Sequence, residues 1–199
     1  MGKMKQHNDL EQTKWEENVR RTKDTAKKIF PYEKWIDAVS IKFKYQGEDF
    51  DLPTGIENIK VSHSRLTHIK NDEQILAKEI KQGKILAEKG AFVYLLPKLK
   101  SPDGKYIPGP DALVNGVLFE FKTVTGSIKK VERRFRESRE QCKNVFIKID
   151  NPNVSGADVT ADIKLILHDK KYTGGTEGTL IIYLSQTKKI YSMQIKDLK

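Results

Sequence analysis

Cysteine is almost absent from this chain of 199 residues, in which Cys142 is the single example. One cysteine cannot form an intramolecular disulfide, so the class of small disulfide-stabilised secreted proteins is excluded. No apolar run approaches the roughly 18 residues that a membrane-spanning helix needs, which excludes a transmembrane protein. The polar N-terminus lacks the apolar stretch of a signal peptide. We therefore expect a protein that acts in the cytoplasm and has no membrane partner.

Acidic residues are too few to balance the basic ones. The chain has 37 Lys and Arg against 27 Asp and Glu, a formal net charge of +10, and hydrophobic residues make up 37%. That hydrophobic share is low but sufficient for a core. The excess charge favours a polyanionic partner, most often nucleic acid. It is concentrated in residues 61–150, which carry a net +7, against +1 in residues 1–60 and +2 in residues 151–199.

The first 60 residues predict an N-terminal extension. Trp15, Val19, Ala26 and Ile29 form one stripe of a helix that Pro31 ends. The alternation over residues 39–45 then predicts a half-buried strand. Such an extension either packs on the main domain or binds a partner separately. We expect the main domain over residues 61–199, with its core in residues 72–150.

The core pattern predicts an α/β fold with a mixed sheet of the α+β kind. A helix is expected from Asn71 or Asp72 to about Lys89, stopped by Gly90. Strands are expected at 92–97, 111–114, 117–124 and 144–150, with a helix capped by Ser127 before the last. The element order is therefore helix, strand, strand, strand, helix, strand. A helix around 159–168 and a hairpin formed by 179–186 and 189–195 complete the chain.

A tight turn predicts the position of two carboxylates. Asn115-Gly116 is a strong hairpin signal, because both residues tolerate the positive φ of a type I′ turn. A two-residue turn there places Asp111 opposite Glu120, and Lys122 on the same face. Like charges directly opposed on a sheet are unfavourable, so a bound cation or a shared proton is the simplest compensation. An ordinary salt-bridge cluster on an exposed sheet face is the alternative.

Such a group suits phosphodiester hydrolysis. Carboxylate oxygens are hard ligands for Mg²⁺, which also contacts phosphate and lowers the pKa of a bound water. A lysine nearby can orient that water or neutralise the developing charge. The apolar residues Ala112, Val114, Val117, Phe119 and Phe121 are left for the other face of the hairpin.

The stretch from Pro110-Asp111 to Glu120-Phe121-Lys122 resembles the signature of the PD-(D/E)xK nuclease superfamily, whose core has a similar αβββαβ order. The resemblance covers about residues 72–150. It implies that Asp111 and Glu120 bind Mg²⁺ or Mn²⁺, that the Phe121 carbonyl completes the metal site, and that Lys122 assists the attacking water. The family often carries a further glutamate on its first helix, for which Glu79 is the candidate.

The run from Gly109 through Glu120-Phe121-Lys122-Thr123 and the basic helix to Asp150 also resembles the C-terminal nuclease domains of contact-dependent inhibition toxins and their phage-borne relatives. Several of those domains cleave tRNA. Some have the barnase–EndoU–colicin–RelE type of fold and act on a ribose 2′-hydroxyl without metal. On that alternative the resemblance implies roles for His63 or His68, Lys122, Thr123 and Gln141. It also implies an immunity protein as partner, for which the charge suggests acidic character.

The helix after Ser127 is strongly basic. It has seven Lys and Arg residues against three Glu between residues 129 and 143. Phosphate contacts from this helix would position a nucleic acid without reading its sequence. The candidates for such contacts are Lys129, Lys130, Arg133 and Arg134. The alternative is a solvated face laced with ion pairs.

The sequence thus predicts an endonuclease for RNA, particularly tRNA, or for DNA. A non-catalytic nucleic-acid-binding module of a phage or mobile element is the alternative from another class.

Overall fold

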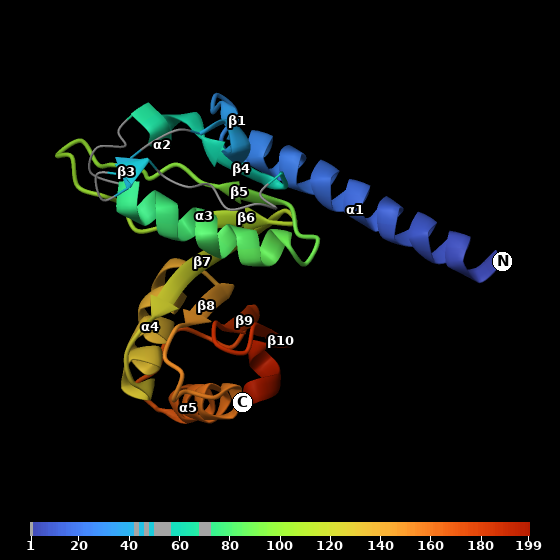
Figure 1. Ribbon diagram of the computed structural model, residues 1–199. Coiled ribbons are helices and arrows are strands. Elements are labelled where there is room, and N and C mark those ends of the chain that lie inside the picture. Colours follow the sequence, from blue (N-terminus) through green and yellow to red (C-terminus); the bar gives the residue numbers. More distant parts are fainter. Residues whose placement is uncertain (1, 42–43, 46–47, 50–56, 68–72) are drawn as a thin grey trace. The chain divides into compact units, whose positions relative to one another are not determined.

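The computed structural model describes residues 2–41, 44–45, 48–49, 57–67 and 73–199. These residues form two compact units, which are described separately (Figure 1). Unit 1 comprises Met1–Ile107 and Asp111–Val117, and unit 2 comprises Pro108–Pro110 and Leu118–Lys199. The domain boundary that we expected at residue 60 lies inside a strand of unit 1, β4 (Ile59–Ser62).

Unit 1 combines helices with a mixed set of strands. Its strand order is β1-β4-β5-β6, in which β4 and β5 are parallel and the other neighbours are antiparallel. Its elements are α1 (Gly2–Ile29), β1 (Trp35–Asp37), the 3₁₀ helix η1 (Ala38–Ser40), β2 (Lys44–Tyr45), β3 (Glu48–Asp49), β4, α2 (His63–Thr67), α3 (Glu73–Ala87), β5 (Val93–Leu95) and β6 (Ala112–Val114).

Helix α3 confirms the helix predicted between Asn71 or Asp72 and about Lys89. Its inner face carries Leu76 and Ile80, both fully buried, and Gly83, where an added Cβ would lie 3.5 Å from side-chain atoms of Ile59 and Val93. This glycine lets α3 lie close to β4 and β5. Gly90 has a φ of +80° at the end of the helix, as its role as a stop requires. The cap expected at residues 71–72 lies outside the described residues.

The N-terminal region follows the prediction only in part. Helix α1 ends at Ile29, two residues before Pro31, as predicted. The strand predicted over residues 39–45 is wrong in its first half, because residues 38–40 form η1 and Val39 is exposed. Strand β1 lies earlier, where Trp35 packs on Tyr94 with ring centroids 4.5 Å apart. This contact with the buried Tyr94 ring outweighs the alternation that suggested a later strand.

Unit 2 is built from repeated strand–helix–strand connections. Strands β7 (Val117–Val124), β8 (Val145–Ile149) and β9 (Thr179–Leu184) are parallel neighbours, and β10 (Lys189–Gln194) is antiparallel to β9. Helices α4 (Ile128–Gln141) and α5 (Gly156–His168) form the two crossovers and pack on one another (Figure 1). A 3₁₀ helix, η3 (Ile195–Leu198), follows β10.

The core of unit 2 explains why these segments fold as they do. Val131 and Phe135 of α4 and Val159 and Ile163 of α5 are fully buried against alternate residues of β8 and β9. Ser155 caps α5 through a reciprocal capping box with Asp158. Ser127 occupies the N-cap position of α4 as predicted, but its side chain makes no capping hydrogen bond.

The fold class is confirmed as α/β with mixed strand directions. From α3 through β5, β6, β7 and α4 to β8, the chain has the predicted αβββαβ order, and the terminal hairpin is present as β9 and β10. Asn115 and Gly116 have φ values of 50° and 80°, which confirms the positive-φ turn after β6. No described helix is both long and apolar enough to cross a bilayer.

Candidate functional site

Strand β7 of unit 2 carries a buried carboxylate beside a lysine. Glu120 is 2% exposed, and Lys122 donates a hydrogen bond to its Oε1 as part of an ion pair. The lysine side chain is 18% exposed, so it links the buried carboxylate to solvent. Residues two apart on a strand project to the same face. The prediction that Glu120 and Lys122 share a face is therefore confirmed.

The parallel register with β8 identifies that face. Glu120 is paired with Val145 and Lys122 with Ile147, two core residues packed beneath α4 and α5. Phe121 lies on the other face, where its ring meets Phe146 at a centroid distance of 5.4 Å. Thr123, paired with Lys148, is on that same opposite face. Lys122 and Thr123, which the metal-free alternative groups together, thus project to opposite sides of the sheet.

The segment that follows α4 fixes the beginning of β7. The Asn144 Nδ2 group donates to the Leu118 carbonyl at 2.8 Å, and the Cys142 thiol donates to the same oxygen at 3.2 Å. The Asn144 Oδ1 atom accepts from Thr179 N at 2.9 Å, so one side chain joins β7 to β9. Burial raises the pKa of the Cys142 thiol, with the nearby Glu120 charge adding to the effect. Cys142 is therefore held as a neutral thiol beside the carboxylate.

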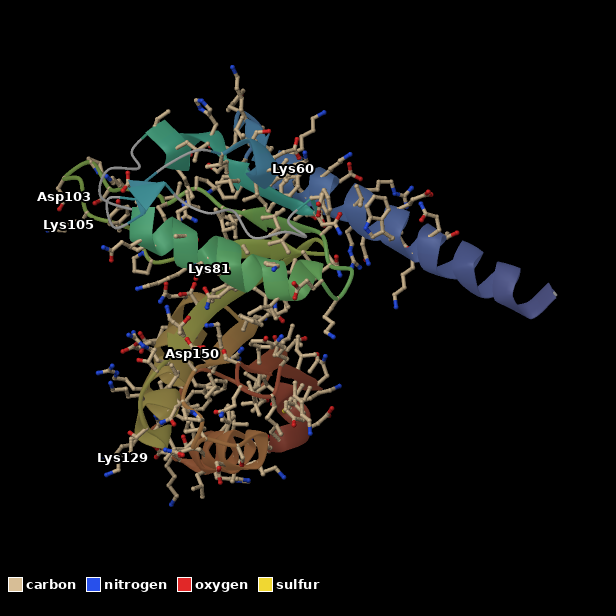
Figure 2. The ribbon with its side chains drawn as sticks, viewed as in Figure 1. Lys60, Lys81, Asp103, Lys105, Lys129 and Asp150 are labelled. Atoms are coloured by element: carbon tan, nitrogen blue, oxygen red, sulfur yellow. The ribbon has the colours of Figure 1, made fainter. Side chains whose placement is uncertain are left out.

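Helix α4 presents two of its candidate cations without a described ion-pair partner. Lys129 and Lys130 are exposed, and Figure 2 shows Lys129 pointing away from the helix into solvent. Arg133 and Arg134 both pair with Glu137, at 3.5 and 2.8 Å. The basic face is thus partly the ion-paired surface of the alternative interpretation and partly free positive charge at the start of the helix.

One arginine of the basic run is structural. Arg139 is buried, and its guanidinium donates to the Tyr172 hydroxyl at 3.2 Å, to the Gly174 carbonyl at 2.8 Å and to the Lys143 carbonyl. Counting it among the residues of a solvated basic face was wrong. Its bonds to Tyr172 and Gly174 hold the loop between α5 and β9 against the end of α4.

Unit 1 contains a second buried charged group, formed by Arg65, Glu79, Lys98 and Asp111. Arg65 of α2 pairs with Glu79 of α3, and Lys98, which follows β5, lies 3.3 Å from Glu79 and also pairs with Asp111. Asp111 precedes β6, and its carbonyl accepts from Leu96 N at 2.8 Å, which extends the β5–β6 pairing by one residue. Four elements of unit 1 thus bring two carboxylates and two cations together.

The electrostatics of this group are dominated by burial. Burial raises the pKa of Glu79, and although Arg65 and Lys98 oppose this rise, the Asp111 charge reinforces it. Burial alone would lower the pKa of Lys98, but the carboxylates of Glu79 and Asp111 outweigh it and the pKa is raised. Lys98 is therefore held as a cation between the two acids.

Both predicted metal ligands are buried. Asp111 is 5% exposed, which rules out an exposed salt-bridge cluster for it as for Glu120. The hairpin register that opposes these two acids joins unit 1 to unit 2 and stays a prediction. Within the described part of the chain, no three His, Cys, Asp or Glu side chains gather in a group that could hold a metal ion. The sequence-based ligand set of Asp111, Glu120 and the Phe121 carbonyl also stays a prediction.

The described residues of the metal-free alternative belong to both units. His63 begins α2 in unit 1 with an exposed side chain, and its backbone N donates to Lys34 O at 2.8 Å. His68 lies outside the described residues. Gln141 ends α4 in unit 2, where its Nε2 donates to the Glu137 carbonyl at 3.4 Å. The pairing of a histidine with Lys122 therefore stays a prediction.

Arg65, Lys98 and Asn144 were missed by sequence reasoning. Arg65 and Lys98 stand 14 residues before and 19 residues after Glu79, and no local periodicity connects such distances. Asn144 had a usable signal, because a polar residue between a helix end and a buried strand often fixes backbone groups.

Comparison with known proteins gives a match to a family model. No curated protein and no solved structure matches the chain significantly. Residues 108–198, which include all of unit 2 except Lys199, match the family model described as the contact-dependent growth inhibition CdiA C-terminal domain.

Proposed function

We propose that the chain is the nuclease part of a contact-dependent inhibition toxin, which cleaves phosphodiester bonds of RNA, tRNA first, in the cytoplasm of a target cell. The single observation that carries the proposal is the coincidence of the family match with unit 2. Within the matched residues lies the ion pair of the buried Glu120 with the partly exposed Lys122 on β7. A buried carboxylate that holds a lysine in place is the kind of preorganised group that stabilises charge on a reacting phosphate.

Lys122 is the residue common to both mechanisms. Its ammonium group is fixed by Glu120 and remains partly accessible, so it can contact a phosphate oxygen that gains charge in the transition state. The hydrogen bonds from Asn144 and Cys142 to the Leu118 carbonyl fix the strand before this lysine and so restrict its movement. Correct placement before reaction lowers the cost of reaching the transition state.

In the metal-dependent form of the proposal, Asp111, Glu120 and the Phe121 carbonyl would hold Mg²⁺ or Mn²⁺. The ion would supply a bound water of lowered pKa and would stabilise the negative charge on the phosphate. Glu79 would help to position Asp111, because Lys98 pairs with both carboxylates. In the metal-free form, the ribose 2′-oxygen would bond to phosphorus as the P–O5′ bond breaks, which gives a 2′,3′-cyclic phosphate and a 5′-hydroxyl. Lys122 would be the cation, with His63 or His68 as the base that takes the 2′-hydroxyl proton and Gln141 as a hydrogen-bonding helper, because Thr123 projects to the opposite face of the sheet.

The nucleic acid is positioned by the start of α4. Lys129 and Lys130 carry exposed charge, and Arg133 and Arg134 can exchange Glu137 for phosphate. Such contacts give affinity that is sensitive to salt and independent of sequence. An acidic immunity protein that covers these cations would neutralise the toxin, which gives the proposed protein partner.

Cleavage of tRNA and duplex DNA, each in Mg²⁺ and in EDTA, tests the proposal and separates its two forms. Cleavage in Mg²⁺ alone supports the metal-dependent form. Cleavage that persists in EDTA and leaves a 2′,3′-cyclic phosphate supports attack by the 2′-hydroxyl. Salt-sensitive binding without cleavage of any nucleic acid would replace the nuclease by a non-catalytic binding module.

A further inference from the structure

Unit 1 contains a pocket of about 500 Å³ that lies outside the residues matched by the toxin family. Its walls come from three segments: the end of α1 with the turn after it (29–33), two residues of α2 (64–65), and the chain after β5 (97–100 with Tyr106). All of these residues belong to unit 1. The pocket therefore forms within one compact body.

Arg65 is the unusual residue of this lining. It is 3% exposed, and one of its nitrogens, Nη1, pairs with Glu79. Its Nε and Nη2 atoms are buried and have no hydrogen-bond partner among the described residues. A guanidinium stays protonated in proteins, and buried donors without acceptors cost free energy. Nε and Nη2 lie on one edge of the guanidinium plane, the edge that binds two oxygens of a phosphate or carboxylate at once.

The remaining lining favours an anion that carries an apolar group. Lys100 adds positive charge, and its ammonium lies 4.7 Å from the centre of the Tyr106 ring. Lys98 is also part of the lining, but its charge is paired with Glu79 and Asp111. The one acid of the lining, Glu33, is already engaged by Ser64, whose N and Oγ donate to it at 3.0 and 2.9 Å. Ile29, Phe30 and Leu99 supply apolar surface beside these charges.

We infer that this pocket binds the phosphate of a nucleotide, with two oxygens on Arg65 Nε and Nη2, Lys100 as the second cation, and the ribose or base against the apolar wall. A planar guanidinium edge fits a phosphate in two-point geometry, which a lysine cannot reproduce. Assigning the nucleotide to a nucleic-acid strand rests on the proposed nuclease function. The pocket would then hold the strand at a point outside the matched region and add to the affinity that α4 provides.

The test is binding by the full chain in conditions that stop both forms of cleavage. A short labelled single-stranded deoxyoligonucleotide lacks the 2′-hydroxyl, and EDTA removes divalent metal, so fluorescence anisotropy reports binding alone. We expect Arg65→Lys and Lys100→Ala each to weaken binding roughly tenfold, the usual effect of losing one charge-assisted contact. The matched control is Lys105→Ala, which removes the same charge from the same loop at a residue outside the lining that pairs with Asp103 at 2.9 Å; Figure 2 shows both side chains at the loop tip.

A second measurement locates the ligand without any substitution. The side-chain Nε–H signal of Arg65 in a nitrogen–proton NMR spectrum should move when a nucleoside 5′-monophosphate is added. A comparable shift and equal competition by inorganic phosphate would identify the pocket as a site for free phosphate. The proposal would be overturned if Arg65→Lys, Lys100→Ala and Lys105→Ala all bound the oligonucleotide as tightly as the wild type and the Arg65 signal did not move.

The outcomes for the pocket and for the nuclease differ. If the wild type does not cleave tRNA but the Arg65 signal moves, the nuclease proposal is contradicted and the nucleotide-binding pocket is supported. If the wild type cleaves tRNA but the Arg65 signal and the binding of the pocket variants do not change, the nuclease proposal is supported and the pocket proposal is contradicted. Because Arg65→Lys can disturb the pair with Glu79, the exposed Lys100→Ala variant keeps the binding test independent of folding.

Discussion

Lys122 is paired with Glu120 from the same face of β7, and the carboxylate in this pair is almost completely buried. A similar pair, in which Lys148 and Asp150 are also two residues apart, begins on the neighbouring strand β8. The Lys148 Nζ atom lies 2.6 Å from Asp150 Oδ1, but the Asp150 side chain is 29% exposed. The two lysines have similar exposure, 18% and 24%. Their difference lies in the acid and in the sheet face, which makes Lys148 a natural control for Lys122.

Removing each lysine should therefore affect stability unequally. Lys122→Met takes away the ion-pair partner of a buried carboxylate, and breaking such a pair costs about 3 kcal/mol when the acid stays charged. Lys148→Met leaves an acid that water can still solvate, so we expect a loss of about 1 kcal/mol or less. Urea unfolding of both variants measures the difference. Equal losses would mean that Glu120 does not depend on Lys122.

The pH dependence of stability should contain a contribution from Glu79. Its pKa is raised by burial, so the folded state holds this proton more tightly than the unfolded state does. The contribution is intact below the unfolded pKa of 4.5 and is lost as pH rises toward the raised folded pKa, by up to about 1.4 kcal/mol per pH unit. In the Glu79→Gln variant this fall should vanish.

The measurement is urea unfolding from pH 4.5 upward for both proteins. The quantity to compare is the difference between wild type and Glu79→Gln at each pH, because other carboxyls titrate equally in both. A difference that stays constant, or that favours the wild type increasingly as pH rises, would contradict the role assigned to burial.

Arg139 and Arg133 lie on the same helix and should differ in what they support. Arg139→Ala removes three charge-assisted hydrogen bonds, to Tyr172, Gly174 and Lys143, that a buried guanidinium makes, so a loss of about 2–4 kcal/mol is expected. Arg133 is exposed and makes only a 3.5 Å surface pair, so Arg133→Ala should change stability by about 0.5 kcal/mol or less. Thermal unfolding of both variants checks this, and comparable destabilisation would refute the anchor role.

The exposed lysines at the start of α4 should be visible in the salt dependence of binding. If Lys129 and Lys130 each contact one phosphate, Lys129→Ala and Lys130→Ala should each lower the slope of log affinity against log salt by about 0.7 for a single strand. Lys164→Ala on α5 serves as a control from the same unit. An unchanged slope in all three variants would remove α4 from the interface.

Sequence patterns predicted the elements of this fold better than its charged contacts. The Asn115-Gly116 turn, the apolar stripe of α3 and the strand–helix order are local features, and local stereochemistry determines them. The first half of the strand expected at 39–45 was wrong because packing of Trp35 on Tyr94, a contact distant in sequence, determines where β1 forms. Propensity yields to such tertiary contacts.

The candidate site also contains contacts that local spacing predicts and contacts that depend on the folded arrangement. Glu120 and Lys122 were predictable as neighbours because a strand repeats every two residues. The links from Arg65 to Glu79 and from Lys98 to Asp111 depend on the folded arrangement of four elements, and no spacing in the sequence encodes them. Arg139 is a charged residue in a run of charged residues, which is typical of a surface. Only its burial in the folded protein distinguishes it from the arginines beside it.

The most direct test of the nuclease proposal is tRNA cleavage by the wild type, Lys122→Met and Lys148→Met at equal concentration of folded protein. With Mg²⁺ present, the wild type and Lys148→Met should cleave, whereas Lys122→Met should lose about a hundredfold or more in rate, the effect of removing one preorganised charge. Cleavage by Lys122→Met at the wild-type rate would contradict the account.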